Sequence, residues 1–209
     1  MKTYDRIIQA SLELFNEHGE RAITTNHIAA HLGISPGNLY YHFRNKEEII
    51  YQIFLQYKQF MENRLSVPTD RPIMVEDMIV YLDTAFIGMW RYRFMFHDLA
   101  GLLGRNEKFA EAYQKFIRED IIAILTALFG EFSSIGLLAT DAEEIESLVV
   151  NCWLIIKFWY AFQQTQNPMG KLTEEMGRRG VRQVLALFKP HIQPMFRPLF
   201  AEIQARYHA

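Results

Sequence analysis

The sequence predicts an all-α protein with a small three-helix N-terminal domain and a larger helical C-terminal domain. Hydrophobic residues recur at intervals of three and four along most of the 209 residues, as they do on one face of an amphipathic helix. Glycine, proline and helix-capping residues separate these periodic segments. No alternating run bounded by turn residues indicates a strand. Half of the residues are hydrophobic, so the chain can bury a substantial core.

The first helix is expected over residues 4–18. Ile7, Leu14 and Phe15 fall on one face at helical spacing, and Gly19 provides the stop. This helix would pack on the two short helices that follow it.

A short second helix is expected directly afterwards. Thr24 can cap it, with Thr25 as the alternative, because a threonine oxygen accepts from a free N–H of the first turn. Ile28 and Leu32 belong to its apolar face. Gly33 ends it, since glycine adopts positive φ most easily.

The third helix begins only a few residues later. Ser35 can cap it and Pro36 suits its first position, where a missing N–H costs nothing. Leu39 and Phe43, four residues apart, would anchor it to the core. The two short helices and the tight turn between them form a helix-turn-helix, whose second helix lies in the major groove of DNA.

Side chains left facing outward suit contact with DNA. Asparagine can bond a base edge, whereas tyrosine, histidine and hydroxyl groups can reach phosphates, and glycine permits close backbone approach. Lys46, at the start of a further helix, could hold a phosphate together with the helix N-terminus, or could be merely an exposed lysine. The base-reading candidates are Gly37, Asn38, Tyr41 and Tyr40, and the phosphate candidates are Thr24, Thr25, Ser35, Tyr40, His42 and Lys46.

Together these residues carry a family resemblance. The pattern Thr-Thr-x-x-Ile-Ala-x-x-Leu-Gly-Ile-Ser-x-Gly-Asn-Leu-Tyr-Tyr-His-Phe-x-x-Lys-Glu, beginning at Thr24, resembles the DNA-binding domain of the TetR (tetracycline-repressor-like) transcriptional regulators. The resemblance covers residues 3–50 in detail. It implies that the candidates above contact DNA, that the C-terminal domain binds an effector and that the protein is a dimer.

Charge and cysteine content are compatible with that class. The net charge is −2, but residues 21–46 hold three basic and no acidic side chains, so one copy would bind DNA weakly. Cys152 is the only cysteine, which excludes an intrachain disulfide and favours a cytoplasmic location. No signal peptide is evident. The apolar stretch 148–162 is shorter than the roughly 20 residues of a membrane span, so no membrane partner is expected.

The rest of the chain is predicted to be a linker and a series of helices. The fourth helix runs from the N-terminal DNA-binding domain, called the head below, to about residue 64. Two prolines mark a linker at 66–72. Further helical patterns occupy residues 73–92, 93–103, 107–129, 141–166, 172–189 and 199–207.

Local signals mark the joints of this domain. Gly130 and Gly136 bracket a predicted loop, and Thr140 with Glu143 has the spacing of a capping box. The expected domains are residues 1–50, which bind DNA, and 51–209, which bind the effector and form the dimer.

An effector pocket is expected between the helices of the C-terminal domain. Ligand pockets in helical bundles are mostly apolar with a few polar groups, and Asp83 interrupts an otherwise apolar helix. The alternative is that these aromatic stripes are ordinary core. The pocket candidates are Tyr81, Asp83, Met89, Trp90, Phe94, Phe116 and Trp153, and the composition favours a lipophilic small molecule.

The two long C-terminal helices are similar in placement to the pair that forms the dimer interface in the TetR family. Two such helices from each copy would make a four-helix bundle. Glycines on the second helix would be justified by a close helix–helix approach. The interface candidates are Trp153, Tyr160, Gly177, Gly180 and Val184.

The predicted function is a homodimeric, ligand-responsive transcriptional regulator, most simply a repressor, that binds a palindromic double-stranded operator. The alternative is an all-helical small-molecule-binding protein or enzyme that uses the head as a protein-interaction module. No nucleophile–base pair or glycine-rich phosphate loop supports catalysis, so no catalytic residue and no cofactor is expected. His27 and His31 have metal-ligand spacing but no evident third ligand, so no metal is expected.

Overall fold

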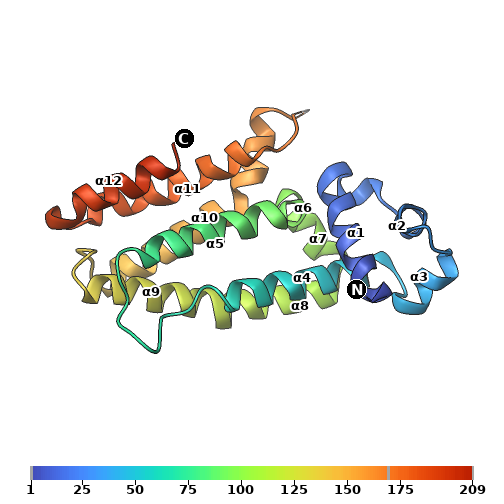
Figure 1. Ribbon diagram of the computed structural model, residues 1–209, viewed down its shortest axis with the longest axis horizontal. Helices are drawn as coiled ribbons and strands as arrows, with labels where there is room; N and C mark the ends of the chain where they lie inside the picture. The colour runs from blue at the N-terminus through green and yellow to red at the C-terminus, as the bar shows by residue number, and fades with distance from the viewer. Residues whose placement is uncertain (1, 169, 209) are drawn as a thin grey trace.

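The computed structural model describes residues 2–168 and 170–208, and helices joined by loops make up its architecture (Figure 1). Within those residues no strand forms, and Leu138 and Ile192 make one isolated antiparallel bridge. The predicted all-α class is confirmed.

The N-terminal head consists of α1 (Thr3–His18), the 3-10 turn Glu20–Ala22, α2 (Thr25–Leu32) and α3 (Pro36–His42), which lie together at one end of the molecule (Figure 1). Its core is fully buried and comes from each helix: Ile7, Phe15, Ile28, Leu39 and Phe43. Both predicted glycine stops adopt positive φ, with 82° at Gly19 and 65° at Gly33. The head is therefore built as its local signals predict.

The fourth helix, α4 (Lys46–Glu62), starts in the head and continues into the body beside α8 (Figure 1). Ile49, Ile50, Ile53, Phe54 and Tyr57 are buried along it. The expected boundary after residue 50 thus falls inside a continuous helix. A displacement of α4 in the body would be carried directly to the head.

The body packs the remaining helices around an aromatic core. Its helix bounds are α5 (Asp77–Arg91), α6 (Arg93–His97), α7 (Leu99–Arg105), α8 (Glu107–Lys115), a π-helical segment (Phe116–Ile121), α9 (Ile122–Ser134), α10 (Ala142–Gln166), α11 (Glu174–Phe188), 3-10 turns at Lys189–His191 and Pro194–Phe196, and α12 (Arg197–Arg206).

Some predicted boundaries are wrong for identifiable reasons. The helix expected from residue 73 begins at Asp77, whose carboxylate accepts from the Met74 N–H at 2.8 Å and so holds the preceding turn. Gly130 lies inside α9, which continues to Ser134, and the chain turns instead at Gly136 with φ 75°. A glycine in a helix lowers helix propensity without forcing a stop.

The cap of α10 is also displaced from its predicted position. Asp141, not Thr140, accepts from the Glu144 N–H at 2.9 Å, while Glu144 accepts from the Asp141 N–H at 3.0 Å. The capping box therefore lies one residue later than expected.

By length and composition alone, α10 is apolar enough to cross a membrane. The core helix of a soluble protein passes the same test. Here α10 packs against α6, α9 and α11, and the side chains of Cys152, Trp153, Ile156 and Tyr160 are buried.

Candidate nucleic-acid interface and ligand cavity

The outward face of α3 is the most exposed aromatic surface of the head. Tyr41 is 85% exposed and Tyr40 is 48% exposed, whereas Leu39 between the head helices is fully buried. Gly37 and Asn38 are also exposed. The four base-reading candidates therefore share one open surface.

Two of the hydroxyl groups predicted to contact phosphate cap helices of the head. Ser35 Oγ accepts from the Asn38 N–H at 3.1 Å and caps α3. Thr24 Oγ1 accepts from the His27 N–H at 3.3 Å, and the Thr24 N–H donates to His27 Nδ1 at 3.3 Å. His27 thus completes the capping box that glutamate usually completes, a role the sequence analysis missed.

Tyr40 joins the two helices of the motif. Its hydroxyl lies 3.0 Å from Thr25 Oγ1, either atom being able to donate. Phosphate contact through either hydroxyl would therefore be made from a pre-positioned pair.

His42 is held by aromatic rings. It meets Tyr41 edge-on at a centroid distance of 5.1 Å and Tyr4 at 6.4 Å. Tyr4 in turn stacks on Phe43 at 4.7 Å. These contacts attach the end of α3 to α1, and no sequence signal marked Tyr4 for this role.

Lys46 differs most from expectation. Its ammonium group donates to the carbonyls of Glu20 at 2.9 Å and Ile23 at 3.1 Å and pairs with the Glu20 carboxylate at 2.7 Å. Only 20% of its side chain is exposed. Three oxygen atoms of the chain already bind the ammonium group. Lys46 is therefore neither free to bind a phosphate nor a surface lysine without a partner. It ties the start of α4 to the turn after α1.

Gly37 has no intrachain reason to be glycine. A Cβ built there would meet only Ser35 Oγ, at 3.9 Å, and Gly37 is not among the glycines with positive φ. The open space on this face leaves room for an external surface to approach the backbone.

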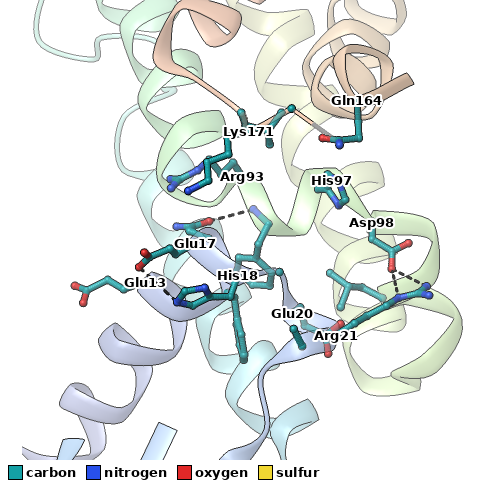
Figure 2. Close-up of a pocket in the computed structure, with 18 residues that line it drawn as sticks. Glu13, Glu17, His18, Glu20, Arg21, Arg93, His97, Asp98, Gln164 and Lys171 are labelled. Atoms are coloured by element: carbon teal, nitrogen blue, oxygen red, sulfur yellow. Dashed lines mark hydrogen bonds and ion pairs between the residues drawn. The ribbon is translucent and has the colours of Figure 1, made fainter. Parts of the chain in front are cut away.

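A polar cleft of about 1030 Å³ separates the head from the body (Figure 2). Ion pairs flank it: Arg21 reaches Asp98 at 2.9 Å, as Figure 2 shows, and Arg105 reaches Glu20 at 3.0 Å. Asn16 spans the same junction, donating to the Arg91 carbonyl at 2.9 Å and accepting from the Phe94 N–H at 3.1 Å. The head is therefore docked on the body by directional contacts.

A second, apolar cavity of about 60 Å³ lies inside the body between α4, α5, α9, α10 and α11. Two of the pocket candidates, Tyr81 and Trp153, line it. Its other walls are Met61, Leu65, Met78, Leu82, Ala85, Ile121, Leu125, Leu128, Phe129, Phe132, Cys152, Ile156, Val184 and Phe188.

The other pocket candidates lie elsewhere. Asp83 accepts from the Tyr207 hydroxyl at 2.6 Å and pairs with Arg206, so it holds α12 on α5. Trp90 lies under the Arg93 guanidinium, 4.1 Å from its ring centroid. Phe94 packs on Phe15 beside the polar cleft. Met89 and Phe116 are buried in the core. Helical spacing could not show which of these residues line the cavity, because several faces of each body helix are buried against other helices.

The dimer candidates face inward. Tyr160 is fully buried, Gly177 and Gly180 contact rings of α5 and α10, and Val184 lines the apolar cavity with Trp153. They therefore pack α10 and α11 of one subunit together. The exposed face of α10 instead carries a stripe of large hydrophobic residues at a spacing of four: Val150, Leu154, Phe158 and Phe162, each 45–51% exposed.

Comparisons with known proteins decide the family. Residues 56–200 match the TetR family described as "Bacterial transcriptional repressor", and residues 7–53 match "Bacterial regulatory proteins, tetR family". The chain belongs to the TetR family. A TetR-family transcriptional regulator from Marinobacter aquaeolei VT8 has a solved structure with 42% sequence identity, 99% coverage of both chains and a TM-score of 0.89.

Named TetR-family relatives are more distant. The regulator UidR of Escherichia coli K12 is 35% identical over 77 residues, which span 37% of this chain and 39% of UidR. The negative transcriptional regulator of a biofilm operon, IcaR of Staphylococcus epidermidis, is 25% identical over 83% of this chain and 91% of IcaR.

TetR regulators are soluble proteins that bind DNA as dimers and respond to small molecules. This chain is accordingly a DNA-binding transcriptional regulator of the repressor class, as its motif predicts. Its family is one of regulators rather than enzymes.

Proposed function

We propose that two copies of this TetR-family chain bind a palindromic operator and that a lipophilic effector in the body controls the binding. The observation that carries this proposal is the open face of α3, where Tyr41 is 85% exposed. A large exposed aromatic side chain beside a glycine with open space above it suits a macromolecular surface better than solvent.

The residues of the head divide by role in this proposal. Gly37, Asn38 and Tyr41 read base edges, since they are exposed along α3. Thr24, Thr25, Ser35, Tyr40 and His42 contact phosphates and set the register. Lys46 supports these residues without contacting DNA, because its ammonium group already has three oxygen partners in the chain.

The second copy would cover the exposed face of α10. Four large hydrophobic side chains at a spacing of four form a stripe along three turns of this helix. Packing it against its symmetry mate, with α11 alongside, gives a four-helix bundle and an isologous dimer. Trp153, Tyr160, Gly177, Gly180 and Val184 support that interface from inside each subunit.

The effector would act through α4. Met61, near the end of α4, and Leu65, three residues beyond that end, line the apolar cavity, and Lys46 begins the same helix in the head. A ligand that favours one position of α4 would change the spacing of the two heads, and it controls binding only by its different affinity for the two spacings. The proposal places the protein in the cytoplasm, where its DNA lies.

Selection of duplexes from a random pool tests the DNA-binding part. The purified protein is used at about 0.15 M salt, which suppresses non-specific binding. We expect a palindrome to be enriched by the wild type and by Met195→Ala, a control at a 78% exposed residue outside the head. Tyr41→Ala should recover it poorly. The absence of any enriched palindrome, or equal recovery by Tyr41→Ala, would overturn the proposal.

A further inference from the structure

One of the residues that line the apolar cavity carries a buried polar atom without a partner. Of its lining residues, Tyr81 donates its hydroxyl to the Ser66 carbonyl at 2.9 Å, and burial raises the pKa of the Cys152 thiol to about 12, which keeps it neutral. Trp153 is 6% exposed, and its indole Nε1–H has no hydrogen-bond acceptor in the part of the chain described.

An unpaired buried donor costs free energy, and native proteins satisfy such groups with few exceptions. The aliphatic and aromatic neighbours of Trp153 in this cavity offer no carbonyl or carboxylate to it. A ligand atom that accepts a hydrogen bond would remove the penalty.

The cavity also specifies the charge of its occupant. Within residues 2–168 and 170–208, no Asp, Glu, Lys, Arg or His lines it. Two carboxylates adjoin lining residues in the sequence, Glu62 beside Met61 and Asp120 beside Ile121, and both pair with Lys58. A charged ligand group would therefore be buried without a counter-charge, which is strongly unfavourable.

We propose that the effector is a neutral molecule with an apolar body and one hydrogen-bond acceptor, such as a ketone or ester carbonyl, which receives the Trp153 indole N–H. This assignment rests on the proposed effector site and specifies its chemistry. Amines, carboxylates and phosphates are excluded as the group buried next to Trp153.

The cavity widens when this ligand enters. Its volume of about 60 Å³ is smaller than the roughly 150 Å³ of a cavity that holds benzene. Met61 and Met78 line it, and the unbranched methionine side chain rearranges more readily than branched or aromatic neighbours. Because Met61 belongs to α4, the widening displaces the helix that begins in the head.

The test uses three probes of similar shape: acetophenone, ethylbenzene and benzoate. Binding to the full-length protein is followed through the indole N–H signals in ¹⁵N-resolved NMR, with the Trp153 signal assigned by Trp153→Phe. We expect acetophenone to move that signal as the hydrogen bond forms. Ethylbenzene should bind without moving it downfield, and benzoate should not bind.

Trp153→Phe removes the donor and keeps an aromatic wall. The ratio of the acetophenone Kd to the ethylbenzene Kd should rise about tenfold in this variant, the scale of one hydrogen bond, and comparing ratios cancels the different hydration of the probes. Trp90→Phe, outside the cavity, should leave the ratio unchanged. Continued ethylbenzene binding by Trp153→Phe shows that the site is intact.

An unchanged ratio, binding of benzoate at this site, or no binding of acetophenone up to its solubility overturns the inference. These results leave operator binding untouched, so they are distinct from failure of the proposed DNA-binding function. Acetophenone binding at Trp153 with no effect on operator affinity would support the site chemistry and refute the regulatory role.

Discussion

The ammonium group of Lys46 lies 2.7 Å from the Glu20 carboxylate and also bonds the Glu20 and Ile23 carbonyls. The Glu20 carboxylate is shared, because Arg105 of α7 reaches its other oxygen at 3.0 Å. Lys46 and Glu20 therefore join the start of α4, the turn after α1 and the body at one point. Through this cluster, the lysine of the motif stabilises the packing of the head and does not face outward.

Replacing Lys46 by methionine tests that placement. The variant leaves two carbonyls and part of a carboxylate without their donor, so the free energy of unfolding in urea should fall by about 1–3 kcal/mol. Lys115→Met is the matched control, since Lys115 and Glu119 form an exposed pair, and its effect should stay below about 0.5 kcal/mol. The slope of log K against log salt for operator binding should not change, whereas loss of a phosphate contact would reduce it by about 0.9 per subunit. A reduced slope with unchanged stability would contradict the framework role.

Gly37→Ala separates binding from folding. The new methyl group meets only Ser35 Oγ at 3.9 Å, so stability should be unchanged or rise by up to about 1 kcal/mol from helix propensity. Operator affinity should fall about tenfold or more, because the methyl group occupies the space into which DNA is proposed to approach. Gly104→Ala also has open space and should leave affinity unchanged. The affinity of both variants is measured by fluorescence titration with a labelled operator duplex. Wild-type affinity of Gly37→Ala would remove Gly37 from the interface.

Gly177→Ala should destabilise the contact between α10 and α11. Its Cβ would lie 2.7 Å from both Phe86 Cε2 and the Tyr160 hydroxyl, which belong to two different helices. We expect a loss of about 1–3 kcal/mol in urea unfolding, the usual cost of overpacking. Gly130→Ala, in open space on α9, should instead gain up to about 1 kcal/mol from helix propensity. Equal effects of the two substitutions would refute the close approach.

Asp77 should make stability depend on pH. Hydrogen bonds from Arg71 at 2.6 and 2.8 Å, and then from the Met74 N–H, hold the pKa of this carboxyl below its ordinary value of 3.8. Because the folded-state pKa is the lower one, the stabilisation is complete above the ordinary value and is lost as pH falls through the folded value. Asp77→Asn should therefore be less stable than the wild type at pH 7, and the difference should shrink in urea melts at about pH 3 and below. A difference independent of pH would contradict the role of the ionised form.

Leu154→Glu should separate the proposed dimer. It places a carboxylate in the middle of the exposed apolar stripe of α10, where Leu154 is 47% exposed in the single subunit. Burial of an unpaired charge between two copies is unfavourable, so sedimentation should show a monomer with unchanged helical circular dichroism. Met74→Glu, at a 49% exposed residue before α5, should remain dimeric. A dimeric Leu154→Glu would move the interface to another face.

The sequence by itself determined the all-α class, the helix-turn-helix and the family. These features depend on signals that act within a few residues: the Thr24 and Ser35 caps, Pro36 at a first helical position, and the glycine stops at Gly19 and Gly33. Tertiary structure decided which partners the side chains find. Asp83 holds Tyr207, which lies 124 residues away, rather than a ligand, and Gly177 packs against Phe86 inside one subunit.

Lys46 and Trp153 also show which properties the sequence determines and which the tertiary structure determines. A lysine at a helix start indicates a charge at that position, but its three acceptors come from residues more than twenty positions earlier in the chain. An indole in an apolar helix indicates burial, but five packed helices determine that Trp153 lines a cavity and that its N–H finds no acceptor among the described residues. Helix periodicity and capping are local properties of the chain, whereas the neighbours of a buried polar atom are fixed only when distant helices pack.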